Sequence, residues 1–316
     1  MKYKITAAAV TLSFIAGMIH IAQAASVGPA QQYNPQMNSG DFTTNITNPY
    51  FSLPIGKKMV YESKTEGGTE RVEILIPGWK KTIMGIETLV MWDRVYLNNQ
   101  LIEDTRDYLA QHTNGDVWYF GENVDSYENG RIKDHSGSWI AGVDGAKPGI
   151  WALANPKVGD EFRNEYYANE AEDITKILAV NETVTVPQGT FTGCIKTLEW
   201  TPIDPNTENK YYCKQAGATV LEVDLPGPKH KVEVRGELLQ TDLQGALGVR
   251  LPGVYAKEGI VGPPAKASDD YTDSKSINFK DTPDTDNWLG VAISGLVGLI
   301  LGIVLQKFVF NRRVSL

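Results

Sequence analysis

Four acidic residues, Asp93, Asp104, Asp107 and Glu122, lie on consecutive β segments. Carboxylates are the side chains that a divalent-ion site or an acid/base pair needs. Turn spacing predicts that Asp93 lies opposite Asp104 and that Asp107 lies opposite Glu122. Like charges in such pairs repel unless a cation lies between them or an arginine such as Arg106 is diagonal to them. Odd and even residues of a strand point to opposite faces of a sheet, so the four carboxylates do not all share one face. The predicted metal site therefore consists of the directly opposed pair Asp93 and Asp104. The alternatives are an acid/base dyad of a hydrolase and ordinary solvated carboxylates.

Aromatic side chains are the second group of candidates. Trp92, Tyr108, Trp118 and Phe120 fall on neighbouring β segments, and Trp118 and Phe120 share one face of theirs. Aromatic rings line grooves for lipids and form platforms for sugars, so these four residues are the predicted ligand-binding residues. The alternative is core packing, since aromatic residues are common in ordinary strands.

Asparagine- and glycine-containing turn sequences at nearly even spacing indicate that the acidic and aromatic candidates lie on β-strands. Asn98-Asn99, Asn114-Gly115 and Asn129-Gly130 separate alternating apolar runs, which is the strongest short-range hairpin signal. Another hairpin is expected with Gly67-Gly68 at its turn. No long helical period occurs before residue 288, so the chain is predicted to be mainly β.

The chain also resembles itself at an offset of roughly one hundred residues. "NPYFSLPIGKKMVYES" aligns with "NPKVGDEFRNEYY", which places Gly56 over Gly159. Further along, Gly85 falls on Gly189, and the matching blocks keep one order. We interpret this as a tandem duplication of one β unit.

The predicted fold is therefore two related antiparallel β-meanders that join into a curved sheet or half-barrel. The first unit covers 42–154 and the second 155–241, and a polar segment, 25–41, precedes them. Face-to-face packing of the two units is the alternative way to bury their apolar faces.

Cys194 and Cys213 are the two cysteines of the chain. A lone pair without further ligands at metal spacing, in an exported chain, favours a disulfide. The repeat places the two residues on adjacent strands as diagonal neighbours, one pair out of register, and a small bulge would bring them within bonding distance.

The N-terminus has the features of a secretory signal. Residues 1–24 combine two lysines, an apolar run and Ala22-Gln23-Ala24, so we expect export and cleavage after Ala24. An uncleaved N-terminal anchor is the alternative.

The C-terminal end predicts a membrane anchor. Residues 288–310 begin with an uncharged run of membrane-spanning length, the basic tail 311–316 follows it, and the Pro- and Asp-rich segment 242–287 reads as a polar stalk. We expect a single-pass protein of the cell membrane, with its main domain outside the cytoplasm and one C-terminal helix as its membrane contact.

Small side chains recur every four residues in this predicted helix. Gly290, Ser294, Gly298 and Gly302 would lie along one face, where two helices can approach closely, so a homodimer is one prediction. Glycines tolerated at random in a lipid-facing helix are the alternative.

Composition and motifs narrow the function classes. A formal net charge of -8 argues against nucleic acid or anionic lipid headgroups as partners. The sequence lacks the nucleophile-elbow, zinc-protease and phosphate-loop motifs, and we expect no cofactor. Asn45 and Asn181 stand in glycosylation sequons, which are used only if the host glycosylates exported chains.

Four blocks, "NPYF", "EDTRDYLAQHTNGDVWYFGE", "GSWIAGVDGAKPGI" and "EYYANEAED", resemble a group of exported bacterial β-rich proteins that carry similar blocks in the same order. The resemblance covers roughly 41–224 and implies a shared exported β domain, without an established activity. The chain departs from that group at Cys213 and in its stalk and membrane helix.

The functional expectation is a membrane-anchored extracytoplasmic β domain that serves as a non-catalytic binding module for an apolar or glycan ligand. A structural or interaction protein of the cell surface that self-associates is the alternative, and a hydrolase using Asp and Glu residues ranks below both.

Overall fold

The computed structural model describes residues 33–228 and 232–263. The predicted signal peptide 1–24, the membrane helix 288–310 with its Gly290, Ser294, Gly298 and Gly302 face, and the tail 311–316 lie outside the described residues. Within the described part, no helix is long and apolar enough to cross a membrane.

Strands dominate the described chain, as the hairpin signals predict. One 3-10 turn, η1 (Ser39–Asp41), and one short helix, α1 (Gly253–Ala256), accompany them. The strands are β1 (Phe42–Thr43), β2 (Lys58–Thr65), β3 (Gly68–Leu75), β4 (Lys80–Ile83), β5 (Ile86–Leu97), β6 (Gln100–His112), β7 (Val117–Glu128), β8 (Arg131–Asp134), β9 (Trp139–Ile140), β10 (Lys147–Ala152), β11 (Glu161–Arg163), β12 (Glu165–Tyr166), β13 (Ile174–Val186), β14 (Gly189–Thr201), β15 (Asp204–Cys213), β16 (Ala218–Asp224) and β17 (Val234–Asp242).

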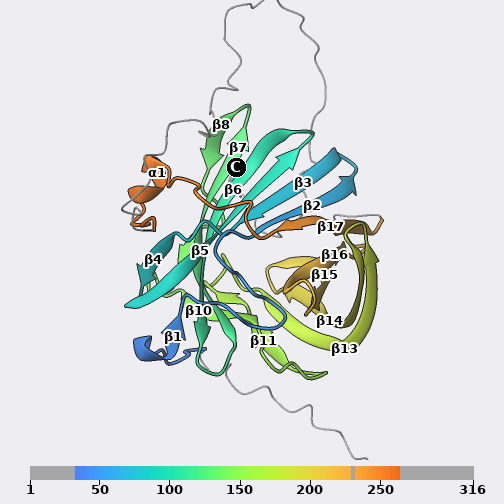
Figure 1. Ribbon diagram of the computed structural model, residues 1–316, viewed down its shortest axis with the longest axis horizontal. Coiled ribbons are helices and arrows are strands. Elements are labelled where there is room, and N and C mark those ends of the chain that lie inside the picture. The colour runs from blue at the N-terminus through green and yellow to red at the C-terminus, as the bar shows by residue number, and fades with distance from the viewer. Residues whose placement is uncertain (1–32, 229–231, 264–316) are drawn as a thin grey trace, which may run out of the picture. The chain divides into compact units, whose positions relative to one another are not determined.

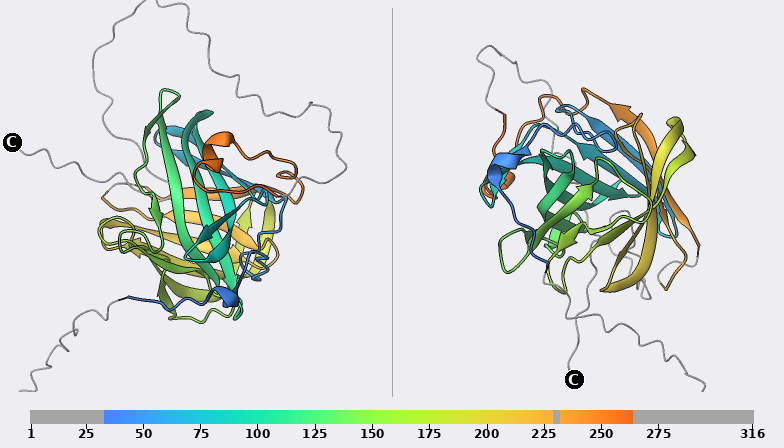
Figure 2. Two further views of the ribbon diagram at one scale, coloured as in Figure 1. Left: turned by 90° about the vertical axis from the view of Figure 1, so that its left-hand side faces the viewer. Right: turned by 90° about the horizontal axis from the view of Figure 1, so that it is seen from below.

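The strands form one antiparallel sheet that curls into a nearly closed barrel (Figure 1). Along the sheet, β7, β6, β5, β3 and β2 follow one another, then β17, β16, β15, β14 and β13. The circuit continues through β11, which pairs with β13, and through β12, which pairs with β10 beside β7. Seen from below, the strands are arranged as a ring (Figure 2).

The join between the two halves of the sheet is the pairing of β17 with β2, in which Leu238 lies opposite Tyr61. The meanders thus meet edge to edge, as expected for a curved sheet, and the sheet curls further than a half-barrel. Edge-to-edge pairing satisfies the backbone groups that each meander alone would leave open.

The asparagine turns occur where the sequence places them, with one change. Asn98 and Asn99 both have positive φ, 51° and 66°, which matches the twist of a tight hairpin. Asn129 and Gly130 form a second such turn. Between β6 and β7 the connection is a longer loop, 113–116, and the β2–β3 turn is shifted by one residue to Glu66-Gly67.

The aligned glycines of the two units share a backbone conformation. Gly56 and Gly159 have φ of 100° and 93°, and Gly85 and Gly189 have φ of 76° and 149°. Left-handed φ is costly for other residues, so glycine is the residue expected at both copies of each turn. The duplication itself and its unit boundaries stay predictions.

The inner face of the barrel is identified by Tyr61. Its hydroxyl on β2 donates to the Thr219 carbonyl on β16 at 2.9 Å, although β17 separates those two strands. A bond that spans a strand in this way lies on the concave side of the curved sheet. Residues that share a face with Tyr61 therefore point into the barrel.

The outer face of β5 and β6 is covered by the segment around α1, which is visible in orange beside these strands in Figure 1. Tyr255 of α1 lies 6.0 Å from the rings of both Trp79 and Trp92, centroid to centroid. This part of the sheet is therefore buried on both faces, which explains its nearly continuous burial pattern.

Candidate functional site

A row of facing residues crosses five strands on the inner face of the barrel. Glu70 lies opposite Ser63, Ser63 opposite Gly236, Gly236 opposite Glu222, and Glu222 opposite Lys210. Directly opposed residues of an antiparallel sheet lie on the same face. Ser63 neighbours Tyr61 at a spacing of two, so the whole row points into the barrel.

A second row lies next to the first. Asp224 lies opposite Glu208, and Glu208 lies opposite Glu199. Asp224 is two residues from Glu222, so both rows share the inner face. The inner surface around Lys210 therefore gathers carboxylates from β14, β15 and β16.

Lys210 is the basic residue within this set. Its Nζ lies 3.0 Å from Glu199 Oε2, 2.9 Å from Glu208 Oε1 and 3.6 Å from Glu222 Oε2. Each contact uses one oxygen of the carboxylate. The other oxygens of two partners, Glu208 Oε2 and Glu222 Oε1, are buried without a hydrogen-bond partner.

Three carboxylates converge beside Lys210. Glu208, Glu222 and Asp224 each present an oxygen, and these oxygens all lie within 4.8 Å of one another. Glu208 and Asp224 are buried and Glu222 is nearly so. Oxygens of ionised carboxylates repel at this separation unless a proton or a cation lies among them.

Glu70 approaches the same group from β3. It is 4 % exposed, and its Oε1 is buried without a hydrogen-bond partner. The two positions between Glu70 and Glu222 in the row are Ser63 and Gly236, whose small size leaves the inner surface open between the two carboxylates. We refer to Glu70, Glu208, Glu222 and Asp224 as the acidic cluster.

Burial and mutual repulsion favour protons on this cluster. Burial, then the charges of Asp224 and Glu103, raise the pKa of Glu70 to about 8. Burial, then the charge of Glu208, raise the pKa of Asp224 to about 8. The pKa of Glu222 is raised well above its usual value by burial and by Glu208. At neutral pH the acidic cluster therefore binds protons, which a cation would displace.

The predicted metal pair Asp93 and Asp104 is not formed, and that prediction is wrong in its register. Asp93 lies opposite Thr105, and Arg94 lies opposite Asp104. A bulge at Ile102 inserts one extra residue into β6 and shifts the pairing by one, which turns Asp93 and Asp104 to opposite faces.

On the outer face, Asp104 accepts hydrogen bonds from two neighbouring side chains. Its Oδ1 accepts from Trp92 Nε1 at 3.0 Å and from Arg106 Nη1 at 2.9 Å. Burial raises the pKa of Asp104, and Arg106 opposes that rise. Asp104 therefore belongs to a buried ion-pair network on the outer face.

The second predicted pair is present. Asp107 lies opposite Glu122 on the inner face, as the turn spacing predicts. The Tyr119 hydroxyl donates to Asp107 at 2.5 Å, and Trp139 Nε1 donates to Glu122 at 3.1 Å. Both carboxylates are at most 1 % exposed, so they are structural acceptors that a substrate does not reach.

The four predicted aromatic ligand residues lie mostly in the core. Trp92, Tyr108 and Phe120 are at most 2 % exposed. The ring of Phe42 on β1 lies 5.4 Å from Phe120 and 6.4 Å from Trp118, centroid to centroid. Only Trp118 is half-buried, so the four residues do not line one open groove.

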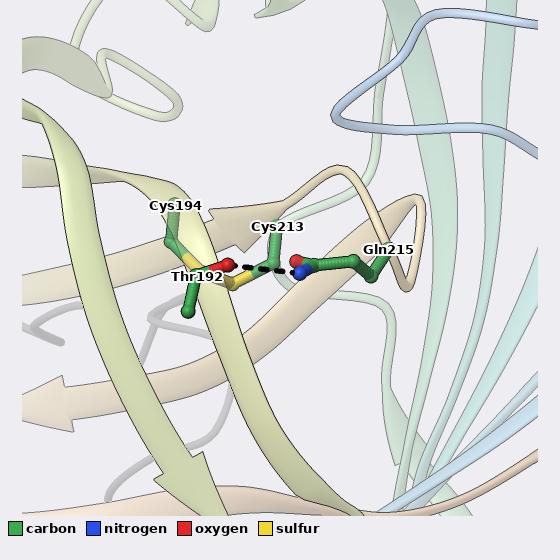
Figure 3. Close-up of a disulfide and its surroundings, with 4 residues drawn as sticks. All are labelled: Thr192, Cys194, Cys213 and Gln215. Atoms are coloured by element: carbon green, nitrogen blue, oxygen red, sulfur yellow. Dashed lines mark hydrogen bonds between the residues drawn. A yellow bond between two sulfur atoms is a disulfide. The ribbon is translucent and has the colours of Figure 1, made fainter.

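The predicted disulfide is present between Cys194 on β14 and Cys213 on β15 (Figure 3). Their Cα atoms are 4.3 Å apart. Ile195 lies opposite Tyr212, which makes the cysteines directly opposed rather than diagonal as the repeat suggested. Beside the bond, Gln215 Nε2 donates to Thr192 Oγ1 at 3.1 Å.

Sequence reasoning missed the acidic cluster, although a signal for it exists. "ENKYY" places Glu208, Lys210 and Tyr212 at alternate positions, and "LEVD" does the same for Glu222 and Asp224. Charges with a period of two on a strand whose other face is also half-buried indicate a polar barrel interior.

Comparison with protein-family models, curated proteins and solved structures found no match for this chain.

Proposed function

We propose that this chain is a non-catalytic binding domain that takes a cationic ligand inside the barrel at the acidic cluster. The observation that carries the proposal is the excess of carboxyl groups on the inner face, where Glu208, Glu222 and Asp224 converge near one lysine and Glu70 lies on the same face. Burying ionised carboxylates is costly, and a cation that replaces their protons would compensate their charge.

The setting proposed for this domain is extracytoplasmic and membrane-bound. The secretory signal 1–24 and the apolar segment 288–310 are the sequence features that support it. The disulfide fits an oxidising compartment, since such bonds persist mainly outside the cytosol.

A binding role is favoured over hydrolysis by the state of the candidate catalytic carboxylates. Asp107 and Glu122 face each other but accept hydrogen bonds from Tyr119 and Trp139. A general acid or base must reach the proton that it transfers, and buried acceptors of this kind do not.

Native mass spectrometry of the full chain, released from its membrane in a mild detergent, tests the proposal. We expect an extra mass that corresponds to a cation and that is lost on denaturation. The Asp224→Asn variant should lose this mass, whereas Glu62→Gln, on the outer face of β2, should keep it.

Two other results of the same measurement are informative. A co-purified lipid or glycan would instead support the apolar or glycan ligand and point to the half-buried Trp118. A bare chain that also fails to take up any added metal or amine would refute the binding function.

Self-association at the cell surface is the second candidate function. Ile55, Leu243 and Leu247 are each more than half exposed, and a Cβ added at Gly56 would lie 2.8 Å from Leu247 Cδ2. Exposed apolar residues that gather in this way favour a contact with another protein. Light scattering should show a dimer that the Leu247→Ser and Gly298→Leu changes weaken; a monomer at all concentrations would refute it.

A further inference from the structure

Further to the proposed binding function, and resting on it, we infer that the acidic cluster is a calcium site ligated by Glu208, Glu222 and Asp224, with Glu70 beside it on the same inner face. The inference specifies the cation, its ligands and the lysine that contacts two of them.

The ligand chemistry selects a hard divalent cation. Within the described residues, the oxygens of Glu208, Glu222 and Asp224 form a group, and no histidine or cysteine belongs to it. Carboxylate oxygens are the preferred ligands of Ca²⁺ and Mg²⁺, whereas zinc and copper sites draw on imidazole or thiolate.

The number of protein carboxylates favours Ca²⁺ over Mg²⁺. Three carboxylates converge here, and one oxygen of each lies within 4.8 Å of the others. Ca²⁺ takes roughly six to eight oxygen ligands in a flexible geometry, whereas Mg²⁺ keeps several waters and usually binds only one or two protein carboxylates.

Lys210 contacts two of the ligands through one carboxylate oxygen each. It contacts Glu208 through Oε1 and Glu222 through Oε2. Glu208 Oε2 and Glu222 Oε1 then remain buried with no hydrogen-bond partner. Buried acceptors are nearly always satisfied in native proteins, and a bound ion is one standard explanation for those that are not.

Glu70 is an independent observation, because it comes from β3, outside the group of three. It is 4 % exposed, its Oε1 has no hydrogen-bond partner, and, after burial, the charge of Asp224 is the largest cause of its raised pKa. Ser63 and Gly236 are the residues that separate Glu70 from Glu222 along the row. Glu70 thus shares the inner face with the other three carboxylates, and only small side chains lie between them.

Glu222 is the most exposed member of the acidic cluster. Its side chain is 13 % exposed, although its Oε1 is buried, whereas Glu70, Glu208 and Asp224 are each at most 7 % exposed. A bound Ca²⁺ would therefore retain water on the Glu222 side, as Ca²⁺ sites commonly do.

The test is calorimetric titration of the full chain in detergent with CaCl2, after treatment with a chelator and exchange into metal-free buffer. We expect one Ca²⁺ per chain with a dissociation constant of about 1 mM or lower, and weaker binding of Mg²⁺ by at least about tenfold. Asp224→Asn and Glu222→Gln should each weaken Ca²⁺ binding by about tenfold or more. Glu62→Gln should bind as the wild type.

Thermal unfolding distinguishes a variant that has lost the Ca²⁺ site from one that does not fold. Ca²⁺ should raise the unfolding midpoint of the wild type and leave that of Asp224→Asn unchanged. The metal-free midpoint of Asp224→Asn should stay at or above that of the wild type, because the substitution removes a buried carboxyl group that its carboxylate neighbours disfavour in the ionised form. Wild-type chain that takes up no Ca²⁺ at about 10 mM, or Asp224→Asn that binds as the wild type does, overturns the inference.

The two proposals fail in different ways. An organic amine that co-purifies with the wild type and is lost in Asp224→Asn, without Ca²⁺ binding, would refute the calcium site and leave the binding function intact. Absence of both amine and metal binding would refute both.

Discussion

Arg106 and Glu258 lie 152 residues apart in the chain and form a partly buried ion pair, with 2.9 Å between Arg106 Nη2 and Glu258 Oε1. Arg106 also contacts Asp104 and Asp125, each at 2.9 Å, and its guanidinium lies 4.5 Å from the ring centre of Tyr255. The segment that follows the last strand is thus fixed to the outer face of β6 by charge as well as by aromatic packing.

Removing Arg106 should destabilise the barrel strongly. Arg106→Ala leaves Asp104, Asp125 and Glu258 without their common cation, at an expected cost of about 3–5 kcal/mol in unfolding free energy, measured by urea denaturation. Arg235→Ala is the control, because Arg235 is 44 % exposed and its surface ion pairs contribute at most about 1 kcal/mol. Equal losses for the two variants would contradict the role given to Arg106.

The disulfide should contribute through the unfolded chain. Cys194 and Cys213 are 19 residues apart, and closing a loop of this size is associated with about 3 kcal/mol. The double variant Cys194→Ala/Cys213→Ala should lose about this amount relative to the oxidised wild type. Reduced wild type should unfold at nearly the same urea concentration as the variant, and a large gap between them would argue against a chain-entropy effect.

Closure of the barrel at β10 requires glycine at position 149. A Cβ on Gly149 would lie 2.2 Å from the backbone oxygen of Asn164, next to the β10–β12 pairing. Gly149→Ala should therefore cost about 2–3 kcal/mol, since backbone must move to admit the methyl group. Gly253→Ala is a matched control with no atom within 4 Å of the added carbon, and it should leave the stability unchanged or slightly raised.

Lys57 should make stability depend on alkaline pH. Its Nζ donates to the carbonyls of Ser52, Ala216 and Gly217, and burial lowers the pKa of Lys57 to about 8 from 10.5. Between about pH 8 and 10.5 the unfolded chain keeps a proton that the folded chain has released, so stability rises with pH in that window, by up to about 3 kcal/mol. Below pH 8 both states hold the proton and the contribution is flat.

Urea denaturation of wild type and Lys57→Met from pH 7 to 9.5 isolates this effect, because other titrating groups are common to both chains. The difference between the two curves should grow with pH. A difference that is constant across the range would show that Lys57 keeps its proton.

Local rules predicted much of the fold. Asn98 and Asn99 adopt the left-handed conformation that a tight hairpin demands, and the opposed pair Asp107 and Glu122 follows from turn spacing. The cysteines were paired correctly because a chain with two cysteines offers only one pairing.

The error in the predicted metal pair comes from the extra residue at a bulge. Ile102 shifts the β5–β6 register by one, and this shift moves Asp93 away from Asp104. Bulges have no reliable local signature, because their position depends on how a barrel must bend. The acidic cluster depends on strand pairing as well, since the register of β15 with β16 places Glu208 opposite Asp224.

The pairing of β2 with β17 also has a consequence for how this chain folds. β2 lies near the start of the described chain and β17 is its last strand, so one edge of β2 stays open until nearly the whole domain is available for pairing. An open edge is a template for pairing with another nascent chain, and contacts between distant segments form slowly. The chain therefore depends on being kept apart from its copies until its own C-terminal strand arrives.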